Sequence, residues 1–297
     1  MSLSNPVPPA AESLVDGRSA EIRQSVSSSH GSCPSCGQGR PASSVGEIFV
    51  YAVGAIEPRF PTLAVEKEFA QAAGRAEAPN LKDREAAYAV LSKPENWYLA
   101  RQLCWVFLIK GFDTYVVVPP GAEELRLLIQ TFRPKRTSSD IDILIGMAGP
   151  PVGGRACNGL MLPAVSVAQL YSFNEQDFVA HLSRQKDVPE NSFAASVSVL
   201  LRLADNPGAR SDHRAINYLV TRDPSLHAAV AQRSARNLPL TGVRARSSGI
   251  IATREVLDVI FTFRQAQANV TEELCTGVDV TELFPFLTSK LGPYIER

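Results

Sequence analysis

Two cysteines, Cys33 and Cys36, stand three positions apart near the start of this 297-residue sequence. Thiolates at this spacing can reach one tetrahedral ion from a tight turn, which Pro34 and Gly37 would favour. A redox-active C-x-x-C pair is the alternative, but such a pair normally opens a helix after a strand, and this one lies in a polar segment. A structural zinc site would need two more ligands, and the sequence has no second C-x-x-C.

The other three cysteines are isolated in the sequence and have different surroundings. Cys157 lies in a glycine-rich loop, which can present a ligand freely. Cys104 lies in an apolar segment, where a small buried hydrophobic residue is the competing interpretation. Cys275 falls on the polar side of a predicted hairpin, and we expect a free thiol there. We therefore expect a structural zinc site formed by Cys33, Cys36, Cys104 and Cys157, which would attach the N-terminal segment to the core.

No complete catalytic signature is present. The sequence contains no G-x-S-x-G, H-E-x-x-H, P-loop or dinucleotide-binding motif. Cys157 and His213 could serve as nucleophile and base, although nothing in their spacing requires it. A histidine at the start of a helix, as His213 would be, more commonly hydrogen-bonds locally. The sequence thus favours a protein without a catalytic centre and leaves an enzyme as the alternative.

A charge-dense stretch with interleaved phenylalanines follows the first predicted strand, and a second charged group opens a later predicted helix. The pattern of the first favours a solvated helix face with paired charges, and a lip that binds a peptide is the alternative. The candidate binding residues are Glu57, Arg59, Glu66, Lys67, His213 and Arg214.

Charge and hydropathy exclude two classes of partner. The chain has 30 Lys and Arg against 30 Asp and Glu and a pI near 6.9, whereas a nucleic-acid binder needs a basic excess. The longest purely apolar run, 104–109, is far shorter than the roughly 18 residues that span a membrane. The polar, proline-containing N-terminus lacks the pattern of a signal peptide, so we expect a cytoplasmic protein.

The elements that must position these residues form two regions. Residues 1–44 are rich in Ser and Pro and contain no aromatic residue, so we expect a mostly disordered tail that carries the C-x-x-C pair. Residues 45–297 are expected to form one domain. Strand patterns at both ends and helical patterns in the middle predict an α+β fold, in which a mixed sheet is combined with a central helical segment and a C-terminal β-hairpin.

Three local patterns sharpen this expectation. Apolar spacing predicts a helix over 94–109, which includes Cys104. Strands at 114–118 and 141–147 with a helix over 122–132 between them predict a parallel crossover unit. Alternating residues in 254–264 and 270–280 predict the terminal hairpin.

Several longer segments resemble one known family. They are FVYAVGAIEPRFP at 49–61, YLARQLCW at 98–105, CNGL at 157–160, DHRAINYL at 212–219, VDVT at 278–281 and FPFL at 284–287. These segments resemble the C-terminal domain of the cyanobactin maturation proteases PatG and PatA, a domain long labelled as of unknown function. The resemblance covers residues 33–297, and the family carries cysteines in the segments of Cys33, Cys36, Cys104 and Cys157, which agrees with a zinc site. The subtilisin-like part of those proteases is missing, and no catalytic residue carries over.

The resemblance implies a stand-alone accessory domain in ribosomal peptide (cyanobactin-like) natural-product biosynthesis. We expect a zinc-stapled, non-catalytic protein that binds a precursor peptide or a modifying enzyme. One alternative is a peptide-modifying or hydrolytic enzyme that uses Cys157 and His213. A homodimer that forms through the terminal hairpin is the other.

Overall fold

The computed structural model describes residues 47–295, except 82, 135–139, 186–189, 249–252 and 266–269. The chain divides into one unit of Met1–Val45 and a second of Gly46–Arg297, and the described residues belong to the second. The predicted tail at 1–44, with Cys33 and Cys36, lies outside the described residues.

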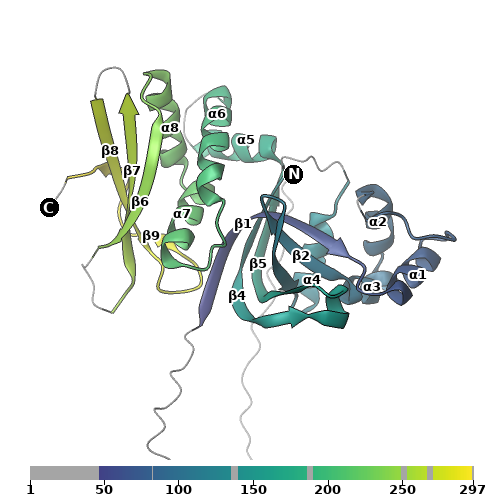
Figure 1. Cartoon of the computed structure of the whole chain (residues 1–297). Coiled ribbons are helices and arrows are strands. Elements are labelled where there is room, and N and C mark those ends of the chain that lie inside the picture. Colours follow the sequence, from purple (N-terminus) through teal and green to yellow (C-terminus); the bar gives the residue numbers. More distant parts are fainter. Residues whose placement is uncertain are drawn as a thin grey trace, which may run out of the picture. The chain divides into compact units, whose positions relative to one another are not determined.

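The described residues form ten strands and eight α-helices (Figure 1). The strands are β1 (Ile48–Arg59), β2 (Cys104–Ile109), β3 (Phe112–Val118), β4 (Ile141–Gly153), β5 (Met161–Phe173), β6 (Leu240–Ser247), β7 (Val256–Gln265), β8 (Val270–Asp279), β9 (Phe286–Leu287) and β10 (Gly292–Pro293). The helices are α1 (Leu63–Ala72), α2 (Arg84–Leu91), α3 (Trp97–Gln102), α4 (Ala122–Thr131), α5 (Glu175–Gln185), α6 (Glu190–Leu201), α7 (Ser211–Arg222) and α8 (Pro224–Ala235). None of these helices has the length and apolar character needed to cross a membrane.

The strands form two sheets. Five of them close into a barrel in the order β1-β2-β3-β5-β4, in which β3 and β5 are parallel and the other pairs are antiparallel. The second sheet has the order β10-β8-β7-β6 and is antiparallel, with β9 paired to β8. The predicted α+β class, the mixed sheet and the C-terminal hairpin of β7 and β8 are confirmed.

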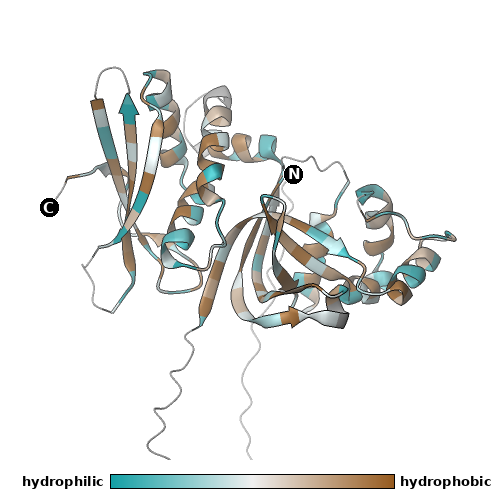
Figure 2. Cartoon of the chain, in the orientation of Figure 1, coloured by the Kyte–Doolittle hydropathy of each residue, from teal (hydrophilic) through white to brown (hydrophobic). Residues whose placement is uncertain are grey.

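Strand β1 is buried on both of its faces and therefore takes part in two hydrophobic cores. Val50 and Ala52 belong to a core shared by the five barrel strands and the helices α1 to α4. Tyr51 and Val53, of the opposite parity, pack in a second core with α5 to α8, β7 and β8. Figure 2 shows hydrophobic residues along β1 and along the helices α6 to α8. The helical layer thus packs against both sheets.

The helix predicted over 94–109 is wrong in its second half, because α3 ends at Gln102 and β2 begins at Cys104. Every residue of β2 is buried, since Trp105 and Phe107 face the barrel core while Val106 faces a third, smaller core. A strand that is covered on both faces shows a continuous apolar run, and such a run cannot be distinguished from a buried helix by periodicity alone.

The predicted crossover unit is also wrong in its pairing. The strand parallel to β3 is β5, whereas β4 runs antiparallel between β1 and β5. The prediction missed this because β4 and β5 are long neighbouring strands, and only the second of them reaches β3. Strand β6 had not been predicted at all; it forms the last strand of the second sheet.

Candidate functional site

A pocket of about 770 Å³ opens where β1 ends and α1 begins. It is lined by residues from β1, α1, the segment before α2, the first residue of α2 and the end of α4: Glu57, Pro58, Arg59, Phe60, Glu66, Ala78, Pro79, Asn80, Leu81, Arg84 and Phe132. The lining combines both signs of charge with two aromatic rings. Such a mixture suits the side chains of a peptide better than a purely apolar ligand.

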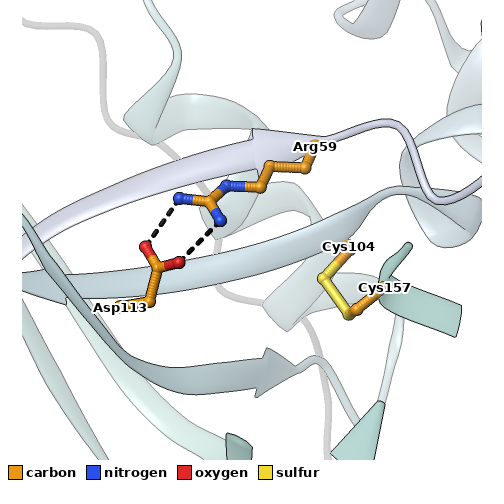
Figure 3. The surroundings of a disulfide bond; sticks show 4 residues. All are labelled: Arg59, Cys104, Asp113 and Cys157. Atoms are coloured by element: carbon orange, nitrogen blue, oxygen red, sulfur yellow. Dashed lines mark hydrogen bonds and ion pairs between the residues drawn. A yellow bond between two sulfur atoms is a disulfide. The ribbon is translucent and has the colours of Figure 1, made fainter. Parts of the chain in front are cut away.

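Arg59 is held in a fixed orientation at this pocket by Asp113 of β3. Its two terminal nitrogens donate to the two carboxylate oxygens at 2.7 and 2.6 Å, as Figure 3 shows. These hydrogen bonds raise the pKa of the Arg59 guanidinium, so the group stays charged at any physiological pH. Asp113 was not predicted from the sequence, because it lies 54 positions from Arg59 and only the barrel brings the two together.

The opposite wall of the pocket contains a second fixed arginine. The Arg84 guanidinium lies 4.7 Å from the centre of the Phe132 ring, and its Nη1 donates to the Thr131 carbonyl at 3.3 Å. Phe60 packs edge-to-face on Phe69, with the ring centres 5.3 Å apart. Arg84 and Phe132 could not be predicted from the sequence, because they lie 48 positions apart and meet only in the folded chain.

Three of the predicted binding residues, Glu57, Arg59 and Glu66, line this one pocket. Lys67 is exposed on α1 and is not among the lining residues. His213 and Arg214 belong to α7 and do not line the pocket either. The structure therefore separates the six candidate binding residues into one group at the pocket and another on α7.

The two candidates on α7 differ from each other. Arg214 is 4% exposed and donates to the carbonyl of Val280 at 2.7 Å, so its charge is used inside the protein. His213 is half-buried, and its Nδ1 has no hydrogen-bond partner among the described residues. Burial lowers the pKa of His213, an effect that the neighbouring Asp212 partly opposes. His213 is therefore neutral at pH 7.

Two of the four predicted zinc ligands lie side by side. Cys104 at the start of β2 and Cys157 in the turn between β4 and β5 are joined by a disulfide, and their Cα atoms are 5.2 Å apart (Figure 3). A pocket of about 510 Å³ borders both residues. Cys33 and Cys36 are outside the described residues, and within the described ranges no three His, Cys, Asp or Glu residues are grouped as for a metal ion. Cys275 is a free thiol, as predicted, and burial raises its pKa.

The described geometry does not assemble the alternative Cys–His pair. The sulfur of Cys157 is bonded to Cys104 in this structure, so a thiolate at Cys157 requires that the disulfide first be reduced. His213 is not among the residues that line the pocket beside Cys157. A nucleophile and a base within hydrogen-bonding reach would be needed for covalent catalysis.

Two family models match the chain. The model of the PatG domain matches residues 49–153, and the model of the PatG C-terminal region matches residues 183–294. A solved structure described as the PatG domain of unknown function aligns with a TM-score of 0.66 and 20% sequence identity, over 83% of this chain and 98% of that chain. At this identity the likeness shows the fold. A search of curated proteins gives no match.

Proposed function

Since the chain is a PatG-related domain protein, with a role related to cyanobactin biosynthesis, we propose that it is an accessory, non-catalytic domain that binds a precursor peptide. The observation that carries the proposal is the pocket of about 770 Å³ at the end of β1. Its place of action would be the cytoplasm, where ribosomal peptides are made. The second candidate partner is a modifying enzyme, which would present a peptide-like loop to the same pocket.

The pocket supports peptide binding through its arrangement of charges. Glu57 and Glu66 provide carboxylates for basic or hydroxyl side chains, while Arg59 and Arg84 provide guanidinium groups for acidic ones. Both arginines are positioned by bonds within the protein, to Asp113 and to the Thr131 carbonyl. Groups that are already ordered lose less conformational entropy on binding, which favours affinity.

Zinc is the second part of the proposal. The pairing of Cys104 and Cys157 supports it, because two cysteines this close can supply half of a tetrahedral thiolate site, and Cys33 and Cys36 would supply the other half. The same two sulfurs cannot be a disulfide and zinc ligands at once. In a reducing cytoplasm the thiols are kept free, which favours the metal. Bound zinc would be structural and would tie the N-terminal segment to β2.

The binding proposal is tested by calorimetric titration of the protein with precursor peptides encoded beside its gene. Glu66→Gln should weaken binding several-fold, since it removes a charge from the pocket lining. Lys67→Gln is the matched control, because Lys67 is the next residue on α1 but does not line the pocket. Absence of binding to every precursor peptide and every neighbouring enzyme would refute the proposal.

The zinc proposal is tested by elemental analysis of protein purified under reducing conditions. We expect about one zinc per chain in the wild type, and loss of zinc in Cys104→Ser and Cys157→Ser. Cys275→Ser is the control, since Cys275 lies on β8 and takes no part in the pair. Wild-type protein that contains no zinc while its thiols are reduced would show the zinc assignment to be wrong.

A further inference from the structure

No strand in the described part of the chain pairs with the outer edge of β6. In the sheet order β10-β8-β7-β6, β6 pairs with β7 along one side. Along its other side, none of the residues that the structure describes exchanges a backbone hydrogen bond with it. A row of unpaired N–H and C=O groups on a strand edge is a template for another strand.

The ladder between β6 and β7 indicates which groups point outward. Just after β6, the N–H of Ser248 donates to the Val256 carbonyl at 2.8 Å, so these residues form a hydrogen-bonded pair. Such pairs alternate with non-hydrogen-bonded pairs along antiparallel strands. It follows from the register that the N–H and C=O groups of Val243, Ala245 and Ser247 point away from β7.

A groove of about 460 Å³ accompanies this edge. It lies between β6 and the residues that precede and begin α7, and is lined by Ala209, Arg210, Ser211, Asp212, Ala245, Arg246, Ser247 and Leu257. Five of these eight residues are small or apolar and come from both sides, whereas Arg210, Asp212 and Arg246 add charges at the groove. An added strand would therefore find space for alternate side chains between β6 and α7.

The other face of β6 is basic, although Arg246 also borders the groove. Arg244 and Arg246 have the other parity from Ala245, and their side chains are 52% and 44% exposed. Arg244 reaches across β7 to Glu273 at 2.8 Å, while Arg246 lies 3.6 Å from Asp258. Carboxylates on the same face of an added strand would be cross-strand neighbours of these two arginines.

The charges and the bulge of β6 leave the middle of its outer edge uncovered, because the side chains of Arg244 and Arg246 extend over a face of the sheet. Residues 240–247 contain neither Pro nor Lys, and the bulge between Leu240 and Gly242 precedes the outward-facing groups. The guanidinium groups of Arg244 and Arg246 lie 5.4 and 5.1 Å from the centre of the Tyr294 ring, which orients them over the face of the sheet. The edge itself is left open to a partner.

We propose that the β6 edge binds an extended, acidic peptide segment as an additional strand. The backbone of the peptide pairs with Val243, Ala245 and Ser247, its small or apolar side chains enter the groove beside α7, and its alternate carboxylates lie beside Arg244 and Arg246. The inference rests on the proposed function, because its occupant is a peptide partner. It adds a surface that is separate from the pocket at Glu57.

The test uses a fluorescein-labelled heptapeptide of alternating valine and glutamate, titrated with the full chain and followed by anisotropy. Ser247→Pro removes an outward N–H without removing a hydrogen bond to β7, so the fold should persist. We expect this variant to bind about tenfold more weakly than the wild type. Ser247→Ala is the matched control, since it keeps the N–H and should bind as the wild type does.

A second probe removes the dependence on protein variants. The same heptapeptide with N-methyl groups along one backbone edge keeps its charge and side chains, yet it cannot pair with β6 along that edge. Two such peptides are made, one N-methylated along each backbone edge. If the peptide binds by strand pairing, one of these two peptides no longer binds. Equal binding of the unmodified heptapeptide, its N-methylated forms and a heptapeptide of the same composition in scrambled order would overturn the proposal. Equal affinity of Ser247→Pro and Ser247→Ala for the heptapeptide would overturn it as well.

Self-association is measured separately by sedimentation velocity without peptide. A dimer that Ser247→Pro converts to monomer, combined with no binding of the heptapeptide, would show that the edge pairs with a second copy and would overturn the peptide assignment. Failure of the proposed function has a different signature. In that case precursor peptides do not bind, while the heptapeptide still binds the wild type and loses affinity to Ser247→Pro.

Discussion

Arg214 is a buried, charged residue whose side chain forms hydrogen bonds between distant parts of the chain. Its guanidinium donates to three carbonyl groups in the segment after β8, those of Val280, Glu282 and Leu283. The same guanidinium lies 5.1 Å from the centre of the Phe49 ring on β1. Burial lowers its pKa, because the charged form is desolvated. The arginine connects α7, β1 and the segment that follows β8, which is a structural role and not the binding role expected from the sequence.

Arg214→Met should lower the free energy of unfolding by about 3 kcal/mol, because three carbonyls lose their donor and that of the buried Val280 would be left without one. Arg210→Met is the control. The Arg210 side chain is 73% exposed and, among the described residues, pairs with Asp212 two positions on, so its loss should cost less than about 0.5 kcal/mol. Urea denaturation measures both variants, and equal costs would contradict the structural role of Arg214.

His227 makes stability depend on pH. The ring is fully buried; its Nε2 lies 2.7 Å from the Val220 carbonyl, and Ser196 Oγ lies 3.3 Å from Nδ1. Burial lowers the pKa to about 4, although the Val220 hydrogen bond opposes this. The unfolded chain, with an ordinary pKa of 6.5, binds a proton more readily. The contribution of His227 to the free energy of unfolding is therefore complete above pH 6.5 and is lost as the pH falls toward 4.

The gap between the two pKa values corresponds to roughly 3 kcal/mol lost across this range. His227→Gln should flatten the pH dependence of the unfolding free energy between pH 6.5 and 4 by about that amount. An NMR titration of the wild type gives the His227 pKa directly. A value near 6.5 would disprove the effect even if the variant failed to fold.

At the scale of elements, the loop before α7 is fixed onto β1. The carbonyl of Gly208 accepts from the Tyr51 N–H at 2.9 Å, and the side-chain amide of Asn217 donates to the Tyr51 carbonyl at 2.8 Å. Asn206 and Asn217 also exchange hydrogen bonds, at 2.8 and 3.1 Å. Gly208 has a φ of +70°, and a Cβ there would lie 2.2 Å from the Tyr51 carbonyl oxygen.

Gly208→Ala should therefore destabilise the protein by about 3 kcal/mol, from backbone strain together with a steric clash. Gly74→Ala is the matched control, because its φ is +64° but nothing lies within 4 Å of the added Cβ. It should cost only about 1 kcal/mol, the strain alone. The two midpoints of urea unfolding separate the contributions, and similar losses would mean that the loop is not closely packed on β1.

Elements whose ends carry capping or turn residues could be predicted from the sequence. The pair Asp223-Pro224 is typical of a helix start, and α8 begins there, with Asp223 accepting from the Ser225 N–H at 2.9 Å. Strand β2 was missed because both of its faces are buried. Strand β6 was missed because its alternation is weak, with a glycine and two arginines in eight residues.

Only the part of the pocket that comes from one short stretch of sequence could be predicted. Glu57, Arg59 and Glu66 are close in sequence, and a strand followed by a helix brings them to one pocket. Asp113 and Arg84 come from elsewhere in the chain and become neighbours only through the barrel order and helix packing. Local spacing carries no information about such contacts.

At the scale of the whole described molecule, the regions matched by the two family models share one hydrophobic core. That core contains Tyr51, Ile143 and Ile145 from the first region, together with residues of α7, α8 and β7 from the second. Tyr51 also bonds Thr221 across the same boundary, with its hydroxyl 2.7 Å from Thr221 Oγ1. Neither region can keep its buried face covered without the other.

We therefore expect residues 47–295 to unfold in a single cooperative transition. Both tryptophans, Trp97 and Trp105, lie in the first matched region, so fluorescence follows that region alone. Hydrogen exchange of β7 follows the second. The two probes should give the same urea midpoint in the wild type, since loss of either region exposes the shared core. Two separate midpoints would show that the regions are independent domains, and in that case Arg214→Met would change only one of them.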